Sequence, residues 1–124
     1  MCIREWALDA NTTGHSNVCV GYGSLGANTT GATNVVVGKE TLFTNTTASD
    51  NTAVGNQALY YKAGANNTAV GSAALVANTT GASNVAVGKS ALAANTTALD
   101  LVYKSDNNSQ SEMTISGAIG ADPS

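Results

Sequence analysis

The residue types that most often do chemistry are few in this chain and widely spaced. Its 124 residues include two cysteines, one histidine, eight acidic residues and five basic residues. Cys2 and Cys19 lie seventeen residues apart, and no further soft metal ligand lies near either of them. The pair favours two small buried thiols, with a disulfide or a metal site as the alternatives.

The histidine and the acidic residues do not form a known catalytic pattern. His15 lies near Asp9 and Ser16, but no oxyanion-hole motif accompanies them. The acidic residues occupy different positions of the repeat described below, so they do not form the regular aspartate column of a calcium-binding roll. The sequence therefore predicts a protein that is not an enzyme and that uses no metal and no cofactor.

A repeat of about seventeen residues organises most of the chain. Three residue types recur in register. The leucines follow one another at steps of 17, 17, 17, 16 and 17 residues, and the glycines and asparagines at steps of 17, 17, 16 and 17 residues. The leucines are Leu8, Leu25, Leu42, Leu59, Leu75 and Leu92, the glycines are Gly21, Gly38, Gly55, Gly71 and Gly88, and the asparagines are Asn17, Asn34, Asn51, Asn67 and Asn84. Such self-similarity is typical of a stacked architecture.

One repeat, residues 27–43, reads as two turns and two short strands. Residues 28–31 form an Asn-Thr-Thr-Gly corner, residues 35–37 form a β-branched strand, and Gly38 ends it. Residues 41–43 are expected to form a second short strand. The chain is thus predicted to be all-β, a parallel β-solenoid (β-roll) of about six 17-residue coils, in which stacked Asn and Thr side chains form ladders.

The repeat also sets the domain boundaries. Residues 1–104 are predicted to form the solenoid domain, and residues 98–104 are its atypical terminal coil. Residues 105–124 are predicted to form a flexible or subunit-linking tail. Met1 falls inside a repeat, which predicts either a piece of a longer protein or a first coil that needs a neighbour.

The predicted strands are apolar on both sides. Their third residue is always valine, their first is valine or threonine, and their middle residue is small and apolar. One side must fill the interior, so the other leaves an apolar stripe, unless a small middle residue is merely tolerated at the surface. The stripe predicts self-association through Val18, Val35, Ala53, Ala69, Val85 and Ala86.

Aromatic residues are the candidate contacts for a ligand or for the ends of the stack. These candidates are Trp6, Tyr60, Tyr61 and Tyr103. Exposed rings of this kind stack on sugars, while the alternative is packing at edges and ends. The net charge of −3, without a basic patch, predicts no nucleic-acid partner. No stretch approaches the ~20 apolar residues of a membrane helix, so no membrane insertion is predicted.

Two segments resemble a known family. Residues 51–60 (NTAVGNQALY) and 84–92 (NVAVGKSAL) resemble the N-x-A-V-G-x-x-A-L repeats of trimeric autotransporter adhesin heads and similar repeats of phage tail fibres. The resemblance covers the chain to about Thr97 and implies a left-handed parallel β-roll that packs three abreast. This chain has a longer repeat than the adhesin heads, and no coiled-coil stalk, membrane anchor or signal peptide is evident in it.

These observations lead to three functional hypotheses. The first is a non-enzymatic structural protein, a self-assembling fibre, filament or adhesin-head subunit whose partner is itself, as a homotrimer or an end-to-end filament. The second is an adhesin of the tail-fibre type that binds a host surface or a cell-surface glycan. The third is an ice-binding solenoid that uses its threonines. The expected location is extracellular or on a virion surface.

Overall fold

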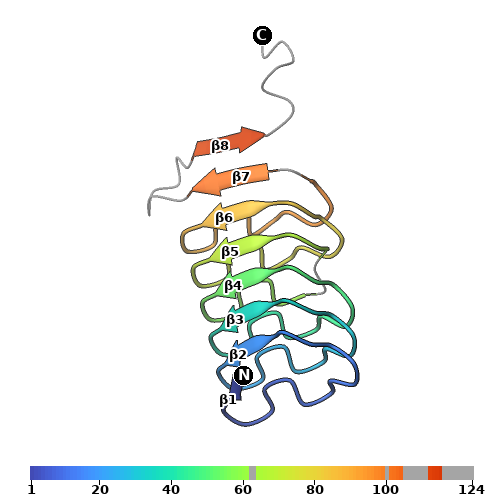
Figure 1. Cartoon of the computed structure of the whole chain (residues 1–124). Helices are drawn as coiled ribbons and strands as arrows, with labels where there is room; N and C mark the ends of the chain where they lie inside the picture. Colours follow the sequence, from blue (N-terminus) through green and yellow to red (C-terminus); the bar gives the residue numbers. More distant parts are fainter. Residues whose placement is uncertain (62–63, 100, 105–111, 116–124) are drawn as a thin grey trace.

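The chain folds into a single stack of short parallel strands (Figure 1). A computed structural model describes residues 1–61, 64–99, 101–104 and 112–115. The eight strands of its sheet are β1 (Cys2–Ile3), β2 (Val18–Val20), β3 (Val35–Val37), β4 (Thr52–Val54), β5 (Thr68–Val70), β6 (Val85–Val87), β7 (Leu101–Lys104) and β8 (Glu112–Ile115).

Strand order in the sheet is the same as strand order in the sequence. Each strand from β1 to β6 pairs in parallel with the next, and each residue pairs with its repeat equivalent, as Val18 does with Val35 and Val35 with Thr52. The step of 16 residues leaves this register intact, because Thr52 still pairs with Thr68. The predicted all-β parallel solenoid is confirmed. Its left-handed sense and its self-association stay predictions.

Each coil contains one strand rather than the two predicted. The segment expected to be a second strand, residues 41–43, is a run of turns. From Gly38 to Leu42, every second residue has a positive φ, which is 133° at Gly38, 53° at Glu40 and 51° at Leu42. An extended strand cannot accommodate such values. Hydrogen bonds still join this segment to its neighbours, because the Leu42 N–H donates to the Ala58 carbonyl at 2.9 Å.

The glycine column marks places where neighbouring coils approach closely. A Cβ atom on Gly38 would lie 2.7 Å from the carbonyl oxygen of Gly55, and the residue has a φ of 133°. Both the spacing and the left-handed backbone exclude an ordinary side chain at this point. The glycines therefore turn the chain directly after each strand.

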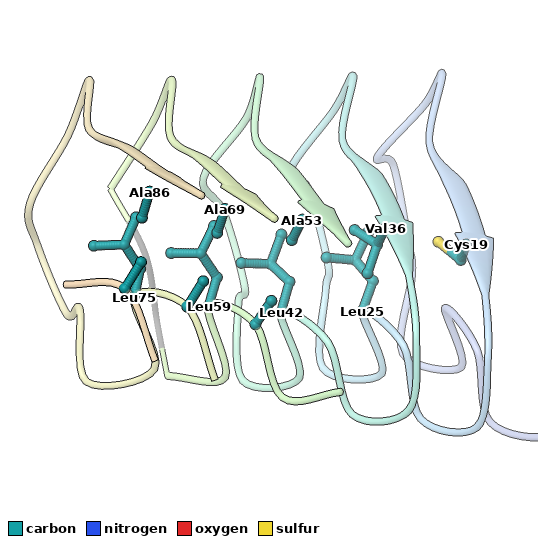
Figure 2. Packing of buried hydrophobic residues seen from close by; sticks show 12 residues of the cluster. Cys19, Leu25, Val36, Leu42, Ala53, Leu59, Ala69, Leu75 and Ala86 are labelled. Atoms are coloured by element: carbon teal, nitrogen blue, oxygen red, sulfur yellow. The ribbon is translucent and has the colours of Figure 1, made fainter. Parts of the chain in front are cut away.

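Two facing columns of apolar side chains fill the interior (Figure 2). The leucines of the repeat project from the turns, and the middle residues of the strands project toward them. The buried middle residues are Cys19, Val36, Ala53, Ala69 and Ala86. Because a leucine already spans much of the narrow interior, the opposite position holds small residues, and alanine fits best.

Two asparagine columns stabilise the corners. In the first, the amide side chains bond to one another along the stack, with Asn28 donating to Asn11 at 3.0 Å and Asn45 donating to Asn28 at 2.9 Å. In the second, each side-chain oxygen accepts the backbone N–H of the next asparagine, as Asn34 Oδ1 does from Asn51 at 3.0 Å. The ladder predicted for the second column therefore runs mainly from side chain to backbone, whereas direct amide-to-amide bonds recur in the first column.

The threonine corners add a weaker ladder of the same kind. The hydroxyl of Thr12 donates to the Thr29 carbonyl at 2.9 Å, and the hydroxyl of Thr29 donates to the Thr46 carbonyl at 3.0 Å. The first threonine of each pair thus bonds along the stack. The second threonine, such as Thr30 or Thr47, is exposed.

The stack ends with a change of strand direction. Strand β7 adds in parallel to β6, with Val102 beside Val85, as expected for a terminal coil. Strand β8 then pairs antiparallel with β7 and lies at the end of the sheet (Figure 1). The remaining residues of the predicted tail, 105–111 and 116–124, lie outside the described part of the chain.

Candidate functional site: an apolar outer face and an aromatic edge

The strands β2 to β6 present a regular apolar surface to the outside of the stack, here called the outer face. It consists of the first and third residues of each strand, which are Val18, Val20, Val35, Val37, Thr52, Val54, Thr68, Val70, Val85 and Val87. Residue alternation along a strand places these two positions on the same side. Val35 and Val87 are 40% and 41% exposed, and the others are exposed or half-buried.

Half of the predicted association surface lies on the wrong side of the strands. Val18, Val35 and Val85 belong to the outer face, but Ala53, Ala69 and Ala86 are fully buried in the core. The prediction combined adjacent positions of one strand, and adjacent positions point to opposite sides. Alanine is chosen at the middle position because the leucine column leaves little room there.

The third-position valines are not among the residues predicted for the association surface. They complete the outer face as a second column beside Val18, Val35 and Val85. A signal for them was present, because this column is valine in every coil, while the middle position varies between cysteine, valine and alanine. A residue that packs against the leucine column inside the stack must be small, whereas a residue that points outward has no such limit on its size.

A second feature is a row of aromatic side chains on the turns, here called the aromatic edge, formed by Trp6, Tyr22, Phe43, Tyr60 and Tyr61. Trp6 and Tyr22 stack with ring centroids 6.0 Å apart. Phe43 and Tyr60 stack at 5.5 Å, and Tyr60 meets Tyr61 edge to face at 5.0 Å. Such contacts between coils stabilise the stack, so edge packing accounts for part of these residues.

Three of the four predicted aromatic contact residues lie on this edge. Trp6 is 65% exposed and Tyr61 is 51% exposed, so both present ring surface to solvent. Tyr60 is half-buried between its two ring partners. The backbone of Tyr103 pairs with Ala86, but its side chain lies outside the described part of the chain. Phe43, which the prediction omitted, shares the repeat position of Tyr60.

The two cysteines lie side by side as free thiols. Cys2 and Cys19 are register partners on β1 and β2, and Cys19 is buried whereas Cys2 is exposed. Burial, followed by the neighbouring Cys2 thiol, raises the pKa of the Cys19 thiol from 9.0 to about 12. Two free thiols were predicted, and burial holds for Cys19 only, because no described strand covers the other side of β1.

The polar side chains that could do chemistry are not brought together. His15 is exposed, and its Nδ1 contacts the adjacent Ser16 hydroxyl at 3.3 Å. Within the described residues, no three histidine, cysteine, aspartate or glutamate side chains gather as a metal site would require. In the same part of the chain, no helix has the length and hydropathy to cross a membrane.

Comparisons with protein-family models, curated proteins and solved structures found no match for this chain. The resemblance to adhesin heads and tail fibres therefore rests on the repeat motif alone. The outer face and the aromatic edge are the two features from which function is argued.

Proposed function

We propose that this chain is a non-enzymatic structural protein, a subunit of a self-assembling fibre or adhesin head. Its strands would pack side by side through the outer face. The observation that supports the proposal is the two-column apolar surface, which repeats without a charged residue from β2 to β6. Apolar stripes of this length on a soluble protein usually mark an interface.

The geometry of the outer face suits a second copy of the same chain. Valine side chains recur on every strand at the strand spacing of about 4.8 Å, so two such faces have matching ridges along their whole length. A self-complementary surface is what closed homo-oligomers require. The motif resemblance favours three copies around a common axis, on the surface of a cell or a virion.

The test is the mass of the particle in solution. Sedimentation of the purified chain should give a multiple of 12.3 kDa, and a variant carrying Val37→Glu and Val70→Glu should sediment as a single chain. Both valines are exposed, so the coils should still form. A matched variant with Thr30→Glu and Thr47→Glu, at exposed corner positions, should keep the parental mass.

Two results would contradict lateral assembly. One is a monomeric parent protein at micromolar concentration, and the other is an unchanged mass for the double valine variant. Electron microscopy of the same samples separates the two modes of assembly, because long uniform fibres indicate end-to-end joining and short particles indicate lateral packing alone.

A second candidate function is binding of a cell-surface glycan. The observation that favours it is the pair Tyr60 and Tyr61, whose perpendicular rings leave half of Tyr61 exposed. Ring faces of this kind stack on sugars. A glycan array probed with the assembled protein tests it, and an array without signal above a Tyr61→Ala variant would reject it.

A further inference from the structure

The aromatic edge contains a small hollow, and none of its lining residues belongs to the outer face. It has a volume of about 130 Å³ and is lined by Trp6, Asp9, Gly26, Ala27 and Phe43. These residues come from the first three coils, so the hollow spans more than one repeat. The repeat is irregular at this place.

The hollow arises from a missing side chain in an aromatic column. The residue that follows the repeat leucine is Asp9, Gly26, Phe43 and Tyr60 in successive coils. Phe43 stacks on Tyr60, with ring planes 23° apart. In the coil on the other side of Phe43, the equivalent residue is Gly26, which has no side chain. A Cβ on Gly26 would lie 3.3 Å from Phe43 Cε2, so the ring lies directly over the glycine.

Trp6 is another lining residue of the hollow. Its ring stacks on Tyr22 with the planes 26° apart, which holds the indole in place although it is 65% exposed. One residue of each stacked pair, Trp6 and Phe43, therefore lines the hollow. Rigid aromatic walls lose little conformational entropy when a ligand binds between them.

The only charged residue among those that line the hollow is acidic. Asp9 is one of the lining residues, and its exposed side chain makes no hydrogen bond or ion pair with any residue that the structure describes. The ring faces of tryptophan and phenylalanine also attract positive charge. The only side-chain hydrogen-bond donor among the lining residues is the indole N–H of Trp6, so the site suits a cation better than a ligand that needs donors.

We propose that this hollow binds a quaternary ammonium group of the choline type. Its methyl groups contact the rings of Trp6 and Phe43, and its charge lies beside Asp9. A cavity of about 150 Å³ holds one benzene-sized ligand, so 130 Å³ suits one such group. The net charge of −3 adds a weak general attraction for cations.

The direct test uses the single tryptophan as its own reporter. Trp6 fluorescence should change saturably when choline is added, with a Kd in the millimolar range, since exposed cation–π contacts are individually weak. The uncharged analogue 3,3-dimethylbutan-1-ol, which has nearly the same shape, should bind at least tenfold more weakly. Equal binding of the analogue, or tighter binding of methyl glucoside, would overturn the proposal.

Three variants keep the reporter and locate the ligand. Asp9→Asn should raise the Kd for choline at least fivefold, and Gly26→Leu should abolish the signal by filling the hollow. Asp50→Asn, at an exposed position outside the hollow, should leave the Kd unchanged. Circular dichroism shows whether each variant folds, and an unchanged Kd in a folded Asp9→Asn protein would reject the site.

Two further probes distinguish a free ligand from a lipid headgroup at a membrane surface. Phosphocholine in solution and vesicles of phosphatidylcholine carry the same cation, free or at a membrane surface. Binding of either one through Asp9 supports the proposal and identifies the source. The experiment is independent of the proposed assembly, because the valine variant that sediments as a single chain should bind choline as the parent does.

Discussion

Replacing Asn34 by alanine tests whether the buried asparagine column stabilises the stack. The Asn34 side chain lies between two coils and is fully buried. Its Oδ1 accepts the Asn51 N–H at 3.0 Å, and its Nδ2 donates to Asn17 Oδ1 at 3.2 Å and to the Ala48 carbonyl at 3.1 Å. Alanine removes all three bonds at once.

The three losses differ in cost. The Asn51 N–H is left buried without its acceptor, which costs about 1–3 kcal/mol. Asn17 Oδ1 keeps the backbone N–H of residue 34, and the Ala48 carbonyl keeps a bond from Asn45 at 3.1 Å. These two losses should cost about 0.5 kcal/mol each. The total is about 2–4 kcal/mol, or a decrease in Tm of about 8–16 °C for a domain of this size.

Urea unfolding followed by far-ultraviolet circular dichroism measures this loss. Asn56→Ala is the matched control, because Asn56 is exposed and its side chain makes no hydrogen bond to a described residue. The control should change the free energy of unfolding by less than about 0.5 kcal/mol. Both variants are compared at one protein concentration, since assembly contributes to apparent stability. A similarly small loss for Asn34→Ala would refute the reasoning and indicate that water replaces the amide.

Four further predictions concern the core, the thiols and the turns. Ala53→Glu should prevent folding, because it would bury a carboxylate among the leucines. Val54→Glu, one residue along the same strand, should still fold. Circular dichroism measures both, and a folded Ala53→Glu protein would place residue 53 outside the core. Iodoacetamide at pH 8 should label Cys2 and leave Cys19 unlabelled until the protein is unfolded, as peptide mass spectrometry would show. Because the folded pKa of Cys19 is raised from 9.0 to about 12, its contribution to stability is present below pH 9 and is lost as the pH rises toward 12, which urea unfolding at pH 8 and pH 10.5 would detect. Gly55→Ala should lower the free energy of unfolding by more than about 2 kcal/mol in the same assay, because its Cβ would lie 2.6 Å from the Gly71 carbonyl and its φ is 130°; a loss no larger than that of Asn56→Ala would contradict it.

The architecture could be predicted because the same sequence motif recurs along most of the chain. Each repeat supplies the same leucine, glycine and asparagine at the same step, so the register of β2 to β6 follows from the spacing alone. The amide ladder follows as well, since identical residues one coil apart must lie beside each other. A periodic sequence leaves few alternative pairings for its strands.

The local path of the chain within one coil depended on the tertiary structure. Residues 41–43 look β-prone, but the positive φ values at Gly38, Glu40 and Leu42 arise because this part of the coil must bring Leu42 into the interior while bonding to the coils on both sides. Likewise, Ala53 and Val54 are both small and apolar, and only the position of the leucine column decides which one is buried.

The candidate ligand site was the least predictable part. Asp9 and Phe43 share one repeat position two coils apart, Trp6 occupies another, and no motif connects the three residues. The stack brings them together because the coils lie one strand spacing apart, and Gly26 leaves the space between them. Sequence alone therefore determined the repeating scaffold, where each contact recurs at a fixed step. Only the tertiary structure decided which side of a strand faces outward and where an irregularity opens a site, because both depend on how side chains of different coils share space.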